Sequence, residues 1–259
     1  MAAQLTSASE GRTMVLTLSN PEHRNALGPE IYAAGVEALN AADSNPEVRS
    51  VVITGAGSTF CAGGNLQRLR DNRSKPPEYQ AQSIEGLHGW IEAIRTFPKP
   101  VIAAVEGAAA GAGFSLALAC DFIVAADNAV FVMAYSTVGL SPDGGGTWSL
   151  TQALPRQLVS ELLMCGERIG SARLQQLGVV NRVTPAGGAL AEAMALAARL
   201  NERAPNALAS IKELVSDAAT APLVRQLASE RDHFVKNLHH PNGGIGIEAF
   251  LAKQPPRYT

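Results

Sequence analysis

The sequence predicts an α/β protein with a mainly parallel sheet, flanked by helices and followed by a helical C-terminal region. Apolar strands at residues 49–54 and 101–105 each lead into a Gly-rich turn and then a helix, a repeated unit typical of parallel sheets. From about Ala189 onward only helices are predicted. With 259 residues, 46% of them hydrophobic, the chain is long enough for one large core and a small appendage. We therefore divide it into a core at residues 1–188 and a C-terminal helical region at residues 189–259.

The first predicted elements are a strand and a long helix. Residues 13–18 form a short apolar strand that ends at a Ser-Asn-Pro turn. A helix follows, with Gly28 as its N-cap and Pro29 at its first position, and it ends near residues 45–46. Its buried face consists of Ile31, Ala34, Gly35, Ala38, Leu39 and Ala42.

The next strand opens into the first Gly-rich turn. Residues 49–54 are rich in β-branched side chains, which favours a strand. Residues 55–66 form a turn in which small residues leave the backbone accessible. Residues 70–82 are charged and contain two prolines, which predicts a mobile loop, either over a site or as plain surface. A helix over residues 83–97 is ended by Pro98.

The central segment, residues 101–126, is a strand, a turn of Gly and Ala, a small-residue helix from Phe114 and a second strand. Between Gly107 and Gly113 no side chain is larger than a methyl group, so a ligand atom can approach the backbone closely. The first N–H groups of the helix are unpaired and carry partial positive charge, which suits a phosphate or a developing oxyanion. Tight packing of helix on sheet, with no chemistry, explains the same residues.

Three other interpretations of the central segment fit less well. A membrane span would bury Glu106 and Asp121, each at a cost of about 2.5 kcal/mol or more. A dinucleotide-binding motif would require Gly or Ala at Leu116. A nucleophile elbow at Ser115 would require a strand that ends at this serine, whereas the predicted strand ends near Val105.

A third Gly-rich turn, at residues 135–148, carries an acid, Asp143. It follows a short strand at residues 130–133 and precedes a helix over residues 150–168, despite an internal proline. Residues 172–183 end in a short apolar strand.

The C-terminal region has helices at residues 190–203, 206–219, 222–237 and 246–253. Leu223, Leu227, Phe234 and Leu238 recur at near-helical spacing in this region. Such an apolar stripe must pack against the core or against another subunit.

Charge and composition exclude several classes of protein. With 21 basic and 23 acidic residues and no basic run, the chain predicts neither nucleic-acid nor membrane-surface binding. The N-terminus lacks the features of a secretory signal, so we expect a cytoplasmic protein. Cys61, Cys120 and Cys165 share no C-x-x-C spacing, which argues against disulfides and a metal site. Cys61, beside a Gly pair, is either a reactive thiol or a small buried residue.

Five short motifs occur in order along the chain. They are NPEHRNAL at residues 20–27, TGAGSTFCAGGNL at 54–66, PKPVIAAVEGAAAGAG at 98–113, SPDGGGTW at 141–148 and AFLAKQPPRY at 249–258. Together they resemble the crotonase superfamily, also called enoyl-CoA hydratase/isomerase, over nearly the whole chain. The resemblance implies a spiral of β-β-α units with a C-terminal helical trimerisation region, assembled as a homotrimer or hexamer. It also implies acyl-CoA thioester substrates, with coenzyme A as part of the substrate and no other cofactor.

The resemblance assigns roles to individual residues. It places two backbone N–H donors for a thioester enolate at Gly64 and Ala112. The residues that it places along the substrate are Arg24, Ala26, Ala62, Gly63, Asn65, Leu66 and Tyr135, with Phe250 and Lys253 reaching the adenine end from the tail of this chain or of a neighbouring subunit.

The departures from the family pattern narrow the predicted reaction. Hydratases of this family hold water with two glutamates, and the matching positions here are Ser115 and Tyr135, neither of which is an acid or base at neutral pH. Asp143 stands where isomerases resembling the ring-epoxide isomerase of phenylacetyl-CoA breakdown carry their catalytic acid. We therefore expect an isomerase that moves a double bond or opens a ring epoxide, with Asp143 as proton carrier.

Other roles for Asp143 and other functions remain open at this stage. Asp143 could cap the following helix, or act as a nucleophile as in the family's aromatic dehalogenases. The chain could also be a hydratase or another crotonase-type lyase, or a CoA-thioester-binding protein without turnover. We expect Tyr135 or Glu106 to carry the proton if Asp143 does not. The residues expected to shape the acyl pocket are Trp90, Phe114, Met133, Tyr135 and the 70–82 segment.

Overall fold

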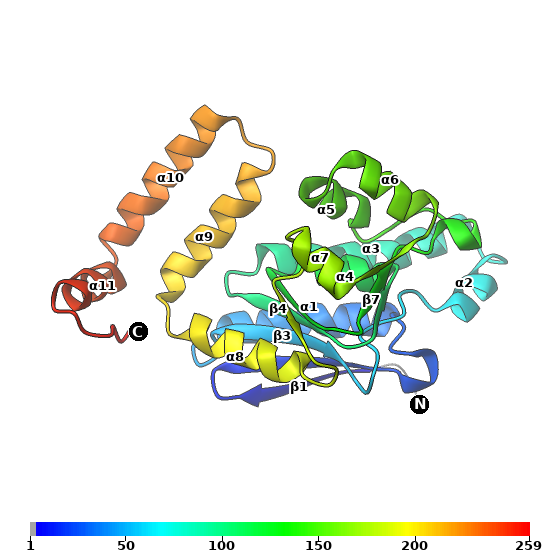
Figure 1. The fold of residues 1–259 in the computed structure, drawn as a ribbon, viewed down its shortest axis with the longest axis horizontal. Helices are drawn as coiled ribbons and strands as arrows, with labels where there is room; N and C mark the ends of the chain where they lie inside the picture. The colour runs from blue at the N-terminus through cyan, green and yellow to red at the C-terminus, as the bar shows by residue number, and fades with distance from the viewer. Residues whose placement is uncertain (1–3) are drawn as a thin grey trace.

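The computed structural model describes residues 4–259 and has at its centre a six-stranded sheet (Figure 1). The strand order is β1-β2-β3-β4-β6-β9, and among these described strands β1 alone is antiparallel to its neighbour. The strands are β1 (Gln4–Glu10), β2 (Thr13–Ser19), β3 (Ser50–Gly55), β4 (Val101–Val105), β6 (Phe122–Ala126) and β9 (Arg182–Thr184). The mainly parallel sheet predicted from the sequence is confirmed.

A smaller sheet turns this arrangement into a spiral. It has the order β5 (Ala108–Ala110), β7 (Val130–Val132), β8 (Arg168–Gly170). β4 runs into β5 and then into helix α4 (Ala112–Ala119), while β6 runs into β7 and then, after the 3-10 turn η2 (Ser136–Val138), into α5 (Gly146–Ala153). These successive strand-strand-helix units form the β-β-α spiral that the family resemblance implied.

Helices cover both faces of the large sheet, so its parallel strands are buried on both sides. On one face, α1 (Pro29–Ser44) and α3 (Pro77–Thr96) pack over Val51 and Ile53. On the other, α8 (Ala189–Asn201) packs over Val52. Successive residues of β3 thus face opposite cores, as the two-residue period of a strand requires.

The remaining C-terminal helices stand away from this core. They are α9 (Pro205–Ala218), α10 (Leu223–Leu238) and α11 (Pro241–Leu251), and Figure 1 shows them extending to one side of the sheets. The apolar stripe predicted on α10 is exposed, with Phe234 at 69% and Leu227 at 55% of their full surface. Helix α8, by contrast, packs on the sheet.

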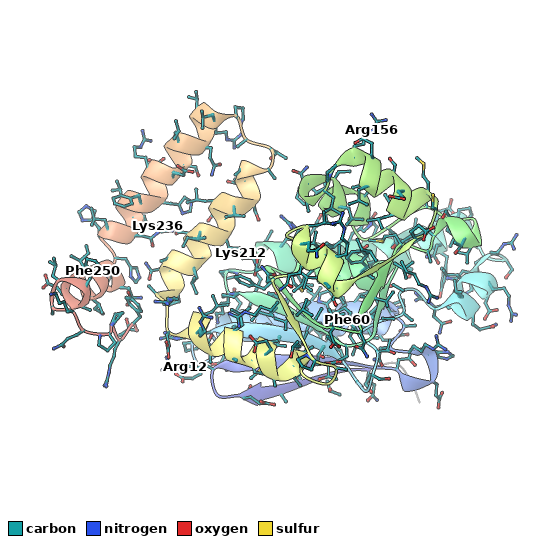
Figure 2. The ribbon with its side chains drawn as sticks, in the orientation of Figure 1. Arg12, Phe60, Arg156, Lys212, Lys236 and Phe250 are labelled. Carbon is teal, nitrogen blue, oxygen red and sulfur yellow. The ribbon has the colours of Figure 1, made fainter. Side chains whose placement is uncertain are left out.

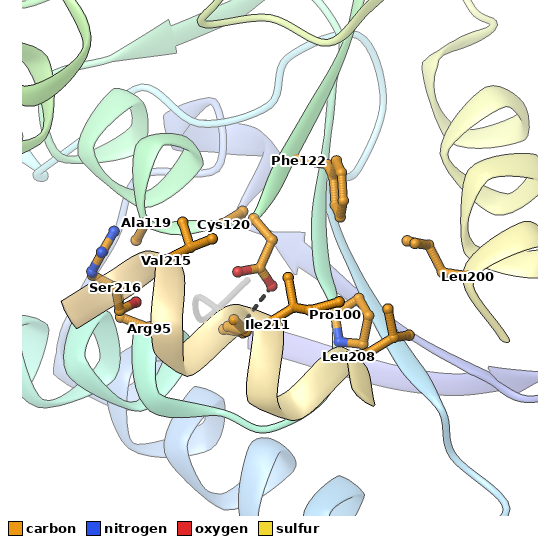
Figure 3. Close-up of a pocket in the computed structure, with 12 residues that line it drawn as sticks. Arg95, Pro100, Ala119, Cys120, Phe122, Leu200, Leu208, Ile211, Val215 and Ser216 are labelled. Atoms are coloured by element: carbon orange, nitrogen blue, oxygen red, sulfur yellow. Dashed lines mark hydrogen bonds and ion pairs between the residues drawn. The ribbon is translucent and has the colours of Figure 1, made fainter. Parts of the chain in front are cut away.

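Helix α9 is tied to the core by one lysine. Lys212 Nζ donates hydrogen bonds to Asp121 Oδ2 at 2.8 Å and to the Ile94 carbonyl at 2.9 Å. Burial raises the pKa of Asp121, and the charge of Lys212 opposes this shift. A hollow of about 310 Å³ lies beside this ion pair, walled by apolar side chains of α9 and of the sheet (Figure 3). This hollow lies where β4 and β6 begin, whereas the Gly-rich turns follow the opposite ends of the strands.

The prediction of a mobile loop at residues 70–82 is wrong. Helix α2 (Leu66–Asn72) and the first turns of α3 occupy most of it. The Asn65 side chain caps α2 by accepting a hydrogen bond from the Arg68 amide, and Pro77 opens α3 at the position where a helix tolerates proline. These two start signals outweigh the polar composition that suggested a loop.

Two other predicted elements are corrected. The helix over residues 150–168 is divided at Pro155 into α5 and α6 (Arg156–Met164), because a proline lacks the N–H that a helix interior requires. The apolar strand at the end of residues 172–183 is mostly a turn after helix α7 (Ser171–Gln176), and only its last two residues enter β9. Strands β1, β5 and β8 were not predicted. β1 is largely exposed, β5 is three alanines, a weak strand-former, and β8 begins at Arg168, where the predicted helix was to end.

No helix within residues 4–259 is long and apolar enough to cross a membrane.

Candidate active site

The first two Gly-rich turns meet beyond the ends of β3 and β4. The Phe60 amide donates to the Glu106 carbonyl at 2.7 Å, and the Cys61 amide to the Ala108 carbonyl at 3.0 Å. The Ala110 amide returns a bond to the Cys61 carbonyl at 2.9 Å. Two turns that are far apart in the sequence are thereby joined by a short parallel bridge between Cys61 and Ala109.

Glycines allow this close approach of backbone to backbone. A Cβ at Gly63, whose φ is +86°, would lie 2.6 Å from the Ala110 carbonyl oxygen and 3.3 Å from the Ala112 nitrogen. A Cβ at Gly113 would lie 2.6 Å from the Cys61 carbonyl oxygen. Any larger side chain at these positions would force the two turns apart.

The two predicted donors, Gly64 and Ala112, lie at this junction. Gly111, with φ +50°, is the N-cap of α4, so Ala112 is the first residue of the helix and its amide lies outside the helical hydrogen-bond ladder. In the part of the chain that the structure describes, neither amide donates a hydrogen bond to another group. Both residues line the same cavity.

This cavity has a volume of about 430 Å³ and is open to solvent. Its floor is the backbone of the two turns, and its walls are α2, α3 and the loop that carries Asp143. The lining residues are Ala62, Gly64, Leu66, Leu69, Gln80, Ile84, His88, Ala110, Gly111, Ala112, Ala134, Tyr135, Val138, Leu140, Ser141, Pro142 and Asp143.

A second, shallower cavity of about 280 Å³ adjoins the first. The two share Ala62, Gly64 and Leu66. The predicted substrate contacts that line the second cavity are Arg24, Ala26, Ala62, Asn65 and Leu66, whereas Gly63 is buried beneath it. The structure therefore brings the predicted residues of the first two motifs to one continuous surface.

Asn25 shapes this surface, although nothing in the sequence singled it out. Its Nδ2 donates to the carbonyls of Ala56 at 2.9 Å and Thr59 at 2.7 Å, while its Oδ1 accepts from the Asn20 amide. Asn25 and Arg24 both adopt positive φ, a conformation that Asn tolerates better than most residues. The buried amide thus fixes the turn that presents Arg24.

Asp143 lies across the cavity from the α2 wall, in a turn with three positive-φ glycines. Its Oδ1 accepts a hydrogen bond from the Tyr135 hydroxyl at 2.6 Å, and its backbone carbonyl accepts from Ser115 Oγ at 3.0 Å. The interpretation of Asp143 as a helix cap is wrong. The N-cap of α5 is Gly145, and no side chain caps this helix.

Tyr135 and Ser115 are the partners of Asp143. Burial and the negative charge of Asp143 raise the pKa of the Tyr135 phenol far above its ordinary value of 10.0. Tyr135 is the donor in its hydrogen bond to Asp143. Ser115 is fully buried below the 143–146 turn.

Helix α3 supplies lining residues that the sequence did not reveal. Gln80, Ile84 and His88 follow one another at intervals of four and share one helix face, which lines the cavity. That spacing was visible in the sequence, but the segment containing Gln80 was assigned to a loop.

Several residues predicted near the acyl pocket lie elsewhere. Trp90, Phe114 and Met133 are buried in the main core and do not line the cavity, because their helix and strand faces point into the sheet packing. Glu106 accepts hydrogen bonds from the amides of Gly187 at 3.0 Å and Ala189 at 2.8 Å. It therefore holds the start of α8 and is not a reserve proton carrier for this cavity.

The tail residues do not reach the cavity within one chain. Phe250 belongs to α11 and is 83% exposed, and Figure 2 shows it far from the core, beyond α9 and α10. Lys253 follows α11 with a positive φ.

Comparisons with known proteins agree with this geometry. Residues 9–259 match the family model described as enoyl-CoA hydratase/isomerase. The chain is 35% identical to the 1,2-epoxyphenylacetyl-CoA isomerase of Escherichia coli strain K12, covering 96% of both chains. It is 33% identical to the 2,3-dehydroadipyl-CoA hydratase of the same strain, covering 99% of this chain and 98% of that protein.

Solved structures of the same architecture are also similar. The crystal structure of an enoyl-CoA hydratase from Polaromonas sp. JS666 has a TM-score of 0.98 and 72% sequence identity, covering 98% of this chain and 99% of that one. An enoyl-CoA hydratase subunit from Geobacillus kaustophilus HTA426 has a TM-score of 0.92 and 35% identity, covering 98% of this chain and 97% of that one. The crotonase fold predicted from the sequence is confirmed.

The three thiols differ sharply in environment. Cys61 is fully buried under the junction of the two turns, and burial raises its pKa to about 12. Burial likewise raises the pKa of Cys120 well above its ordinary value. Cys165 is exposed at the end of α6. Cys61 is thus a packing residue of the site, since its thiol is buried and its raised pKa disfavours the reactive thiolate.

We expect an aromatic disulfide reagent at pH 8 to modify Cys165 alone in the folded protein, and all three thiols after unfolding in guanidinium chloride. Counting released thiolate by absorbance checks this, with Cys165→Ala as the control. Rapid modification in that variant would contradict the buried placement of Cys61 and Cys120.

Proposed function

The chain belongs to the enoyl-CoA hydratase/isomerase family, and within it we propose that the protein is an acyl-CoA isomerase. It moves a double bond, or opens a ring epoxide, through a thioester enolate. The observation that carries this proposal is the placement of one carboxylate, Asp143, in the same cavity as the free amides of Gly64 and Ala112.

The two amides suit an enolate oxygen. They belong to separate turns that line one cavity, and Ala112 adds the positive end of the α4 dipole. Donors fixed in advance stabilise developing charge without reorganisation, and losing one such donor typically costs about 3 kcal/mol of transition-state stabilisation. Gly64 and Ala112 therefore act as the oxyanion donors.

Asp143 carries the proton. An isomerisation requires a base that removes a proton from one carbon and returns it to another, and a single carboxylate serves both steps. The family resemblance puts the two water-holding glutamates of hydratases at Ser115 and Tyr135. Here both side chains instead hold Asp143, which favours proton transfer without water addition.

The adjoining cavity accommodates coenzyme A as part of the substrate. Arg24 and Asn65 offer polar contacts along it, while Ala26, Ala62 and Leu66 leave room at its wall. Phe250 and Lys253 contact the adenine end of a substrate bound to a neighbouring subunit, since neither lines the cavities of its own chain and Phe250 lies far from the core (Figure 2).

A second candidate function is hydration of an enoyl-CoA. Two similar proteins favour it, the enoyl-CoA hydratase of Polaromonas sp. JS666 at 72% identity and the 2,3-dehydroadipyl-CoA hydratase of Escherichia coli. Incubation with 3-hexenoyl-CoA and with 2-hexenoyl-CoA in deuterated water separates the candidates. An isomerase gives bond migration with deuterium exchange, a hydratase gives 3-hydroxyhexanoyl-CoA, and a binding protein without turnover gives neither.

Asp143→Asn tests the proton carrier. The amide keeps the shape of the side chain and can still accept from Tyr135, but it cannot carry a proton at neutral pH. We expect isomerisation to fall by ~10²–10⁴-fold, the range for general acid–base catalysis, with CoA-thioester affinity nearly unchanged. Stopped-flow absorbance and calorimetric titration measure the two quantities. Asp43→Asn, at an exposed position on α1, is the matched control, and full activity in Asp143→Asn would exclude this mechanism.

Ala112→Pro tests the oxyanion donor. Proline is tolerated at the first position of a helix, so the change deletes the amide hydrogen with little loss of α4. We expect turnover to fall by about 10²-fold or more, while melting and far-ultraviolet circular dichroism stay close to those of the parent. An unchanged rate in the folded variant would remove Ala112 from the site.

We also propose that the protein is a homotrimer or hexamer, held by α10 and α11. The expected result by light scattering is a mass at least three times the 27.0 kDa of one chain. Phe234→Glu should yield smaller species, because it places a charge in the apolar stripe. Met164→Glu, at an exposed position on α6, should not. A stable parent monomer would contradict this assembly.

A further inference from the structure

We propose that Tyr135 is the positioning residue of the reaction, which orients the carboxylate of Asp143 through its phenol hydrogen bond. This inference rests on the proposed function of Asp143 and gives Tyr135 a role other than substrate contact. Its starting point is the 2.6 Å distance between Tyr135 Oη and Asp143 Oδ1, within the cavity that both residues line. A hydrogen bond of this length between a hydroxyl and a carboxylate is in the charge-assisted range.

The backbone around Asp143 does not fix its side chain. Gly139, Gly144 and Gly145 all adopt positive φ, and glycines leave a chain many alternative conformations. The 3.0 Å bond from Ser115 Oγ holds the Asp143 carbonyl, which places the main chain but leaves the carboxylate free to rotate. A second tether, on the carboxylate itself, is needed to give it one orientation.

Tyr135 is itself held in place. A Cβ at Gly111 would lie 3.4 Å from Cζ and 3.5 Å from Oη of Tyr135, so the ring end lies against the backbone that precedes Ala112. The phenol therefore links the turn that supplies an oxyanion donor to the loop that supplies the acid. Tyr135 thereby helps to fix the carboxylate relative to the oxyanion donor, together with the Ser115 bond to the Asp143 carbonyl.

The hydrogen bond also makes the two carboxylate oxygens of Asp143 inequivalent. Within residues 4–259, Oδ1 accepts from Tyr135 and Oδ2 accepts from no group. The phenol hydrogen bond therefore occupies Oδ1 and leaves Oδ2 open to the substrate. Oδ2 is thus the atom that takes the proton from the substrate and returns it.

Tyr135→Phe removes this tether while leaving the ring against Gly111. We expect kcat for 3-hexenoyl-CoA isomerisation to fall about 10–100-fold, as misplacing a catalytic group does, with KM within about twofold of the parent. Tyr79→Phe, an exposed tyrosine on α3, is the matched control and should keep the parent rate. An unchanged kcat in Tyr135→Phe, or a raised KM alone, would overturn the role of Tyr135 in positioning.

A double-mutant cycle separates positioning from direct participation. If Tyr135 acts through Asp143, Tyr135→Phe has no further effect on the rate of Asp143→Asn, because no proton carrier remains to be oriented. A further loss of about tenfold in the double variant would show that Tyr135 acts on the substrate by itself. The same four proteins can be compared by deuterium exchange at the α-carbon of phenylacetyl-CoA, followed by mass spectrometry. This substrate has no double bond to move, so the assay measures proton transfer alone.

The same set of variants distinguishes the two proposals. Full activity in Asp143→Asn would remove the proposed proton carrier. Loss of activity in Asp143→Asn, with the parent kcat retained in Tyr135→Phe, would remove only the positioning role. Melting temperatures of all variants confirm that folded proteins are compared, and a Tyr135→Phe variant slowed in kcat but unchanged in melting supports positioning.

Discussion

The close approach of two backbone turns, at residues 60–64 and 106–112, is the constraint on which the rest of this structure depends. Three main-chain hydrogen bonds join the turns, and the sites where a Cβ of Gly63 or Gly113 would lie are already within 3 Å of carbonyl oxygens. Only glycine satisfies that geometry at these two positions, because even the methyl group of alanine would meet a carbonyl oxygen. The same approach brings Gly64 and Ala112 to the lining of one cavity. Packing and chemistry therefore impose the same requirement here, and the packing interpretation does not compete with the functional one.

Sequence reasoning succeeded where a local pattern fixes a local structure. Buried β-branched runs predicted β3 and β4, and the Gly28-Pro29 pair predicted the start of α1. It failed where two local signals conflict. The polar composition of residues 70–82 suggested a loop, whereas the cap at Asn65 and the proline at Pro77 begin helices. It also failed for strand β5, whose three alanines pair with β7 only because the spiral brings them together. Tertiary pairing of this kind leaves little trace in the sequence.

The candidate site shows the same division. The family resemblance supplied Gly64, Ala112, Asp143 and Arg24 as expected site residues, and the structure places them on the lining of two adjoining cavities. Residues that enter the cavity from a neighbouring helix could not be predicted in this way. His88 lines the cavity while Trp90, two positions further on, is buried in the core, and this difference depends on the rotation of α3 about its axis. The hydrogen bond between Tyr135 and Asp143 was equally hidden, since the segment that joins them contains Gly139 and can fold in many ways.

A carboxylate that must accept a proton and then return it has to lie at the substrate cavity and to keep a fixed orientation there. The glycines at 139, 144 and 145 adopt positive φ and form the turn that brings Asp143 to the cavity. Fixed direction comes from Ser115 on the carbonyl and Tyr135 on the carboxylate. Two glutamates at these same positions would hold a water molecule, whereas a serine and a tyrosine hold an aspartate. Under the proposed mechanism, the side chains at positions 115 and 135 therefore decide between two reactions. Either water is added to the substrate, or the proton removed from the substrate is returned to another carbon.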